Sequence, residues 1–367
     1  MAARATGISR DLIIHPGETI ADILEARDMT QNELALRTGV TPVFVSKVIT
    51  GQKSISGRFA MALEYALNVP KSFWLNLQAR YDTEILEADE EDTITAEEKE
   101  VRHKLNDIVK YLRTIGLLEA KETAEASIIS LRKLFNISSL CNLKKIPAMS
   151  AFRISAPCKT DPYVLGAWIR MCQIGEDNSG NLNLYDNEKV DEITEELKNI
   201  MLHDDEDPEL PKKIKTVLKR YGIDFDIVKH FRGAPVQGFL YKRNNGGVRI
   251  CMTTRGAFAD IFWFSLFHEI GHLVNGDLSK PSFIEIKGSN ESKERAADKF
   301  AADKLINKED YKEFLKKYSI SPTYDTIEKF AGQQNVKPYI VIGRMQKEKL
   351  LEYNMYSGAK IRYKWAE

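Results

Sequence analysis

The stretch from Asp260 to Gly276, DIFWFSLFHEIGHLVNG, constrains the fold of this 367-residue chain more than any other segment. It is apolar on nearly all sides, lacks proline and stops at Asn275-Gly276, a pair typical of a helix C-terminus, so it predicts a buried helix. His268 and His272 stand four residues apart and therefore on one face of that helix. Two imidazoles at this spacing can hold one metal ion between them.

Glu269 completes the order H-E-x-x-H and can act as a general base towards a metal-bound water. A metal ion at this place lowers the pKa of that water and polarises a carbonyl group, which is the chemistry needed to hydrolyse a peptide bond. Three fixed residues in five also occur by chance. The alternative interpretation is a pair of core histidines that are hydrogen-bonded to their neighbours.

A third metal ligand is expected from the helical pattern that follows, ESKERAADKFAAD from Glu291 to Asp303. Glu294 and Asp298 lie four residues apart on one face of this helix. We predict that Glu294 binds the metal and that Asp298 orients a metal-bound histidine from outside. Glu291 is a weaker candidate because no acid follows it four residues later. The competing interpretation is a solvated, charged helix face, but the alanines of this segment suit close packing.

The run FWFSLFHEIGHLVNG, followed by ERAADKFAADKLI, resembles the ImmA/IrrE family of zinc metallopeptidases, whose signature is H-E-x-x-H followed by E-x-x-A-x-x-F-A. The likeness extends upstream through GAPVQGF and MTTRG and downstream to KPYIVIGRMQ, so it covers roughly residues 145–350. The resemblance implies Zn²⁺ as the cofactor and a repressor or antitoxin-like protein as the substrate. The end of the ligand helix lacks the family's leucine-rich segment with a proline, a departure that lies outside the metal ligands.

The N-terminal segment predicts a bundle of five short helices. Thr30 and Glu33 form a capping box, and Thr38-Gly39-Val40 makes a tight turn between two short helices. This is the arrangement of a helix-turn-helix. The helices are expected from about Pro16, over Gln31–Arg37, from Pro42 to about Ile49, over Ser56–Leu67 and over Lys71–Tyr81.

The second helix of the helix-turn-helix would place its N-terminal half on base edges in the major groove. The candidate DNA-contacting residues are Gln31, Thr41, Val43, Phe44, Ser46 and Lys47. Val43 and Phe44 are apolar side chains at positions expected to face outwards, which suits contact with thymine methyl groups. The alternative is a bundle used for protein contacts, with Phe44 packed on a partner.

The run HPGETIADILEARDMTQNELALRTGVTPVFVSKVITGQKSIS, ending in FWLNLQARYD, resembles the HigA-type antitoxin branch of the phage-repressor helix-turn-helix family over about residues 9–82. The resemblance implies a homodimer that binds a palindromic operator in double-stranded DNA, usually its own promoter. Lys47 is the only cation of the recognition helix. Operator affinity is therefore expected to be weak or to depend on dimerisation.

Charge and composition bear on whether the chain as a whole is attracted to nucleic acid or to a membrane, and on the state of its cysteines. Lysine plus arginine number 53 and aspartate plus glutamate also number 53, so no global field steers the chain towards nucleic acid or membrane. The four cysteines lack C-x-x-C spacing, and no apolar run reaches about 18 residues. A cytoplasmic protein with reduced thiols and no membrane partner is expected. Residues 82–100, DTEILEADEEDTITAEEKE, predict a solvated acidic linker, with a DNA-mimicking tail as the alternative.

The fold class expected is mainly α with a small antiparallel sheet (α+β). Strand-like runs at 224–229, 237–242 and 247–252 precede the H-E-x-x-H helix, and the last two are joined by a hairpin signal. The edge of this sheet could bind an extended substrate. Tyr339 is a minor candidate for an oxyanion donor.

Three domains are expected: residues 1–82, the helix-turn-helix domain; residues 83–144, an acidic linker and helical spacer; and residues 145–367, a zincin-like metallopeptidase domain. The main functional hypothesis is a DNA-binding transcriptional regulator whose zinc-dependent endopeptidase cleaves a repressor or antitoxin-like protein. The alternative is a HigA-like antitoxin and autorepressor whose metal-binding domain is non-catalytic and binds a toxin or acts as a sensor.

Overall fold

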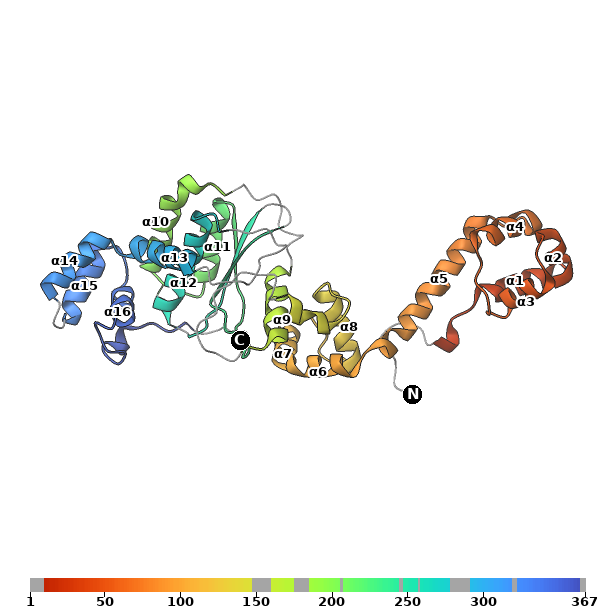
Figure 1. Ribbon diagram of the computed structural model, residues 1–367, viewed down its shortest axis with the longest axis horizontal. Helices are drawn as coiled ribbons and strands as arrows, with labels where there is room; N and C mark the ends of the chain where they lie inside the picture. Colours follow the sequence, from red (N-terminus) through yellow and green to blue (C-terminus); the bar gives the residue numbers. More distant parts are fainter. Residues whose placement is uncertain are drawn as a thin grey trace. The chain divides into compact units, whose positions relative to one another are not determined.

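The structure is a computed structural model, shown in Figure 1. It describes residues 10–146, 160–174, 185–204, 207–243, 247–256, 258–277, 291–318 and 322–363. The chain divides into two compact units, one formed by Met1–Arg102 with Arg113–Leu131 and the other by His103–Leu112 with Arg132–Glu367. The predicted fold class is confirmed, since the described residues are mainly helical and contain one small sheet. No described helix is both long enough and apolar enough to cross a membrane.

The five predicted N-terminal helices are all present: α1 (Pro16–Ala26), α2 (Gln31–Thr38), α3 (Pro42–Ile49), α4 (Gly57–Leu67) and α5 (Lys71–Asp89). Helix α5 continues past Tyr81 into the acidic segment, which was expected as a linker. Arg80 and Glu84 form an i,i+4 ion pair on it at 2.7 Å. Glutamate and leucine are good helix formers, so a high density of acids does not by itself end a helix.

Local signals set the ends of the helices in the helix-turn-helix. The Thr30 hydroxyl accepts a hydrogen bond from the backbone N–H of Glu33 at 3.1 Å, and Gly39 takes the left-handed conformation with φ of 70° at the end of α2. Helices α1 and α3 cross closely at Gly17. A Cβ there would lie 2.6 Å from the carbonyl oxygen of Ile49 and closer still to that of Val48. The crossing therefore requires a residue without a side chain.

His15 caps helix α1 and is 9% exposed. Its Nδ1 accepts a hydrogen bond from the backbone N–H of Gly17 at 2.9 Å, and its ring lies edge-on to Tyr81 with 4.6 Å between centroids. Burial lowers the pKa of His15 below 6.5, although the charges of Glu18 and Asp82 act in the opposite direction. The neutral ring is the form that can accept the capping hydrogen bond.

We expect the first unit to lose stability as the pH falls below about 6.5, because the unfolded chain then binds a proton that the folded His15 does not. The loss should approach the value of a helix cap, roughly 1 kcal/mol. In His15→Asn the amide oxygen can still accept the hydrogen bond but does not titrate, so this pH dependence should flatten. Hydrogen-exchange protection of the α1 amides, compared at about pH 5.5 and pH 7.5, measures the effect. Equal pH dependence in both proteins would contradict it.

The sheet of the second unit has the strands β1 (Ile223–Ile227), β2 (Gly238–Lys242) and β3 (Val248–Met252), in the order β1-β3-β2. The predicted hairpin of β2 and β3 is antiparallel. The prediction of a wholly antiparallel sheet is wrong for β1, which pairs with β3 in parallel. The chain crosses from β1 to the far edge of the sheet before β3 returns through the middle, so β1 and β3 run in the same direction.

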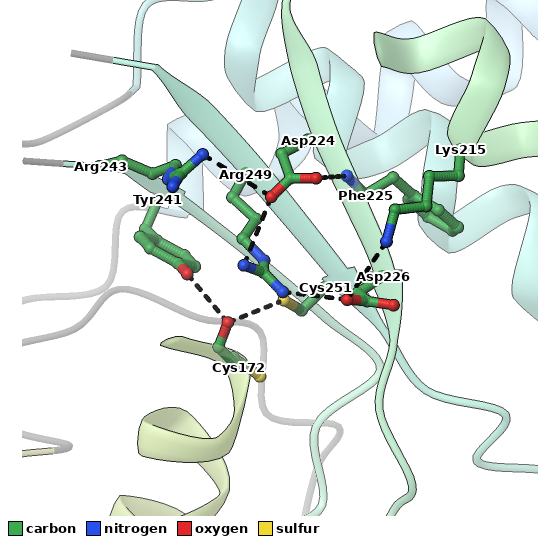
Figure 2. Close-up of polar contacts among 9 residues, drawn as sticks. All are labelled: Cys172, Lys215, Asp224, Phe225, Asp226, Tyr241, Arg243, Arg249 and Cys251. Carbon is green, nitrogen blue, oxygen red and sulfur yellow. Dashed lines mark hydrogen bonds and ion pairs between the residues drawn. The ribbon is translucent and has the colours of Figure 1, made fainter. Parts of the chain in front are cut away.

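One face of this sheet carries a row of polar side chains, shown in Figure 2. The Arg249 guanidinium lies between two carboxylates, 3.3 Å from Asp224 and 3.0 Å from Asp226. Tyr241 donates a hydrogen bond of 3.0 Å to the carbonyl of Cys172, near the end of helix α9 (Pro162–Gln173). Carbonyls in the last turn of a helix lack partners within the helix. The row is thus structural, because it joins the strands and holds the end of α9 on the sheet.

The other helices are α6 (Ala96–Lys104), α7 (Asn106–Thr114), α8 (Ala124–Leu134), α10 (Val190–Met201), α11 (Leu210–Arg220), α12 (Ala259–Val274), α13 (Glu291–Leu305), α14 (Lys308–Tyr318), α15 (Tyr324–Gln333) and α16 (Pro338–Lys347). Helix α12 is the predicted H-E-x-x-H helix, and most of its residues are buried. It packs directly on α13, because a Cβ at Gly271 would lie 3.1 Å from the Cα of Ala297. The small residues of α13 permit this close approach, as the sequence predicted.

Asp204 anchors the C-terminal segment of the described chain to α12 and α16. This carboxylate is 1% exposed, and its Oδ2 accepts hydrogen bonds from Trp263 at 2.9 Å, from Tyr339 at 2.6 Å and from Tyr363. Burial, with the nearby Tyr363 and Asp204, raises the pKa of Tyr339 far above its usual value. The suggestion of Tyr339 as an oxyanion donor is therefore wrong, because its hydroxyl is buried and donates to Asp204.

Candidate metal centre

Helices α12 and α13 bring the three predicted ligands together. His268, His272 and Glu294 each offer a ligand atom, and these atoms lie within 4.8 Å of one another. The two Nε2 atoms are 3.0 Å apart, and each is 3.4 Å from an oxygen of Glu294. The helical spacing of the histidines and the close packing of α13 on α12 produce this convergence. The side chain of Glu291, the competing candidate, is outside the described part of the chain.

A carboxylate lies behind each imidazole. Asp298 Oδ1 is 2.9 Å from Nδ1 of His268, as the sequence predicted. Asp277 Oδ2 is 3.1 Å from Nδ1 of His272, and Lys293 is 3.1 Å from the other oxygen of Asp277. A carboxylate acceptor favours a ring proton on Nδ1, so that Nε2 is the nitrogen of the neutral ring that is available to a metal ion. Sequence reasoning missed Asp277, although an acid directly after the helix-ending Gly276 was a usable signal.

The geometry of the three donors fits a zinc ion. Ligand atoms at about 2.0–2.1 Å from a tetrahedral ion lie roughly 3.3–3.4 Å from one another. The observed separations of 3.0, 3.4 and 3.4 Å are close to these values. Two imidazole lone pairs that face each other at 3.0 Å repel, so this contact requires either a proton on one Nε2 or a cation between the two rings. Two histidines and one glutamate, with a fourth position open, form a donor set used by catalytic zinc sites.

The electrostatics of the cluster also favour a cation. Burial lowers the pKa of His272, but hydrogen bonds to Glu294 and Asp277 and the charge of Glu269 outweigh it and raise the pKa to about 9. The hydrogen bonds to His268 and His272 hold the pKa of Glu294 well below its usual value. The surrounding carboxylates thus stabilise positive charge where the two rings meet.

Glu269 is buried beside the first residue of strand β2. It is 5% exposed, and a Cβ at Gly238 would lie 2.7 Å from its Cγ and closer still to one of its oxygens. Strand β2 is at the edge of the sheet in the described residues. The carboxylate therefore lies where the H-E-x-x-H helix meets a strand edge, and the glycine makes room for it.

The predicted DNA-contacting residues divide into two groups. Gln31, Thr41, Val43 and Lys47 are exposed, and Val43 is 64% exposed; Ser46 is half-buried. Phe44 is half-buried, so the prediction that it faces outwards is only partly right. Its ring packs edge-on against Phe59 of the core with 5.0 Å between centroids, and the Lys53 ammonium lies 4.2 Å from its centroid.

Phe44 turns inwards because it is one helical turn before the buried Val48 and shares its face of α3. The Thr41 hydroxyl is also engaged, since it accepts a hydrogen bond of 3.2 Å from the backbone N–H of Phe44 and so caps α3. Val43 and Lys47 are thus the exposed candidates on the helix itself.

Comparison with known proteins identifies the N-terminal domain. Residues 20–74 match the protein-family model described as helix-turn-helix. The chain is also 38% identical over 69 residues to the virulence-associated protein A' of Dichelobacter nodosus, a match that covers 18% of this chain and 60% of that protein. The chain thus spans less than two thirds of this relative. The N-terminal domain is a helix-turn-helix domain.

Two similar solved structures are antitoxins by description. An addiction module antidote protein of a HigA family from Coxiella burnetii is 26% identical, with 30% of this chain and 98% of that chain covered and a TM-score of 0.20. The Pseudomonas aeruginosa antitoxin HigA with higBA promoter is 27% identical, with 23% and 97% covered and a TM-score of 0.21. Because both scores are below 0.5, the domain assignment rests on the family match and on the helices themselves.

Proposed function

We propose that this protein is a DNA-binding transcriptional regulator whose second unit is a zinc-dependent endopeptidase that cleaves a repressor or antitoxin-like protein. The observation that carries the peptidase part is the convergence of His268, His272 and Glu294, with a carboxylate behind each imidazole. The helix-turn-helix domain supports the regulatory part. We further propose that this domain acts as a homodimer on a palindromic operator, since α3 alone offers few exposed contacts.

Each residue of the cluster has a separate role in this proposal. His268, His272 and Glu294 would hold the ion, and Asp298 and Asp277 would orient the two imidazoles. A bound zinc ion supplies Lewis acidity, which lowers the pKa of a water molecule and polarises the scissile carbonyl.

Glu269 would act as the general base. Its carboxylate accepts the proton of the attacking water and then donates it to the leaving amine. Its burial keeps the carboxylate in a fixed position beside Gly238. A substrate segment that pairs in extended form with the edge of β2 that has no partner strand among the described residues would pass this carboxylate, and such strand addition is a common mode of peptide recognition.

Metal content tests the proposal. By plasma mass spectrometry, the purified protein should contain about one zinc ion per chain, and His268→Ala should contain little. Asp277→Ala should weaken zinc affinity by roughly 10–100-fold, because the orienting partner of His272 is lost. Asp325→Ala, which removes an exposed acid of α15, is the matched control and should behave as the wild type. Little zinc in the wild type, even after zinc is added, would leave a DNA-binding regulator without a peptidase.

A further inference from the structure

A cavity of about 680 Å³ lies in the second unit, between the first half of α12, the helices α13 and α16, and the C-terminal segment. Its volume is within the roughly 300–1,000 Å³ of sites for small organic molecules. The cavity is distinct from the candidate metal centre, because His268, His272 and Glu294 are not among the residues of its wall in the described part of the chain. The side chains that face it therefore indicate which class of molecule it can hold.

The apolar part of the wall is accessible to solvent rather than sealed in the core. In the first half of α12 the residues that are only half-buried are Ile261 and Phe264, and Phe258, directly before the helix, is half-buried as well. These positions are three residues apart, so they lie along one face, and all of them line the cavity. The flat body of an aromatic ligand would cover this accessible apolar face.

The charged side chains of the wall do not balance. Four cations and three carboxylates line the cavity in the described part of the chain, and each carboxylate already pairs with a cation of the same wall. The pairs are Lys360 with Asp260 at 2.7 Å, Arg344 with Glu348 at 3.1 Å and Lys347 with Asp298 at 3.7 Å. One positive charge is left in excess, which favours a ligand that carries a negative charge.

The excess charge belongs to Lys299. This residue is exposed, and it has no ion pair or hydrogen bond with any described residue. Lys299, Ala302 and Ile306 share one face of α13, and all three line the cavity. An exposed residue in the wall lies where the cavity meets solvent. Its ammonium group can therefore donate hydrogen bonds to a carboxylate at the opening while the apolar part of the ligand lies inside.

We propose that this cavity binds a small aromatic carboxylate, with its ring on the apolar face of α12 and its carboxylate at Lys299. The ring covers the accessible apolar surface, and the carboxylate neutralises the excess charge of the wall. Asp298 lines the cavity and also contacts Nδ1 of His268, so the bound molecule lies beside a residue that orients a predicted metal ligand. Binding requires neither zinc nor peptidase activity, so it can be tested independently of the proposed function.

Three naphthalene compounds with the same ring and different head groups test the proposal on the full-length protein. At neutral pH 2-naphthoate is an anion, naphthalene-2-carboxamide is neutral and 2-naphthylmethylamine is a cation. Fluorescence anisotropy should show the naphthoate binding roughly fivefold more tightly than the carboxamide, the upper size of an exposed ion pair, and the amine binding most weakly. Equal binding of the naphthoate and the carboxamide, tightest binding of the amine, or binding of none would overturn the proposal.

A carboxylate can also bind a metal ion directly, so the titrations are repeated after EDTA has removed any metal from the protein. The affinity for the naphthoate should not change, because the proposed site contains no metal. Loss of the naphthoate preference after EDTA treatment would place the compound at the metal centre and refute the site.

Two substitutions in the wall locate the bound compound. Lys299→Gln removes the unpaired charge, so the naphthoate should bind no more tightly than the carboxamide, whose own affinity should stay the same. Ala302→Phe fills the cavity from α13 and should abolish binding of every compound. Lys316→Gln, at an exposed lysine of α14, is the matched control and should bind as the wild type does.

Circular dichroism establishes that each variant is folded. An undiminished naphthoate preference in Lys299→Gln, or unchanged binding by a folded Ala302→Phe protein, would place the compound elsewhere and refute the site. Because Lys299 is exposed, its substitution should not disturb folding, and this variant tests the site even if Ala302→Phe does not fold.

Discussion

Replacement of Glu269 by glutamine is expected to leave zinc binding intact and to reduce peptide-bond cleavage by roughly 10²–10⁴-fold, the usual contribution of a general base. The amide has the size of the carboxylate and fits the same space beside Gly238, where a side chain on the strand would collide. It cannot accept a proton from water. The three predicted metal ligands are unchanged, so the ion should remain.

The same substitution provides a way to find the substrate. Protein N-termini that appear in cells expressing the wild type, but not in cells expressing Glu269→Gln, are candidate cleavage products. The rate is then measured on the purified substrate, with Glu309→Gln, an exposed position on α14, as the control. Zinc content is measured on the same preparations. A zinc-loaded Glu269→Gln protein that cleaves as fast as the wild type would remove Glu269 from the mechanism.

Gly17→Ala is expected to destabilise the first unit by roughly 1–3 kcal/mol, the cost of forcing a methyl group into a closely packed contact. The added carbon would collide with backbone carbonyls of α3, which have no rotamer to change. Helices α1 and α3 must then separate, and α3 is the predicted recognition helix. Operator binding should weaken together with stability.

Gly57→Ala is the matched control, because a Cβ at Gly57 meets no atom within 4 Å. Alanine there should be neutral or slightly stabilising, since it lowers the entropy of the unfolded chain. Hydrogen exchange of the α1 and α3 amides measures both variants in the full-length protein. Equal protection in Gly17→Ala and Gly57→Ala would show that the crossing is not as close as described.

Helical periodicity predicted the parts of the candidate metal centre that depend on local structure. The spacing of His268 and His272, and that of Glu294 and Asp298, follows from helical geometry alone. Asp277 was missed because it follows the helix, where no period applies, and its role depends on how the chain turns back towards His272. The pairing of Tyr339 with Asp204 was missed because it joins residues far apart in the sequence.

In the fold, too, features set by local contacts were predicted, whereas features set by contacts between distant residues were not. Capping residues such as Thr30 placed the helix ends of the first unit, because their hydrogen bonds are local. The orientation of Phe44 depends instead on Phe59, which belongs to the next helix. The parallel pairing of β1 with β3 depends on the route of a connection, and strand-like runs carry no information about that route.

The two compact units alternate along the chain, with boundaries at Arg102, Leu112 and Leu131. The chain therefore passes from one unit to the other three times. A single protease cut or a single genetic crossover cannot separate two such units cleanly, because one product always retains a segment of the other. To exchange one of these units for another, recombination would need a crossover at each boundary in the same gene. The two activities proposed for this chain are therefore expected to be inherited together.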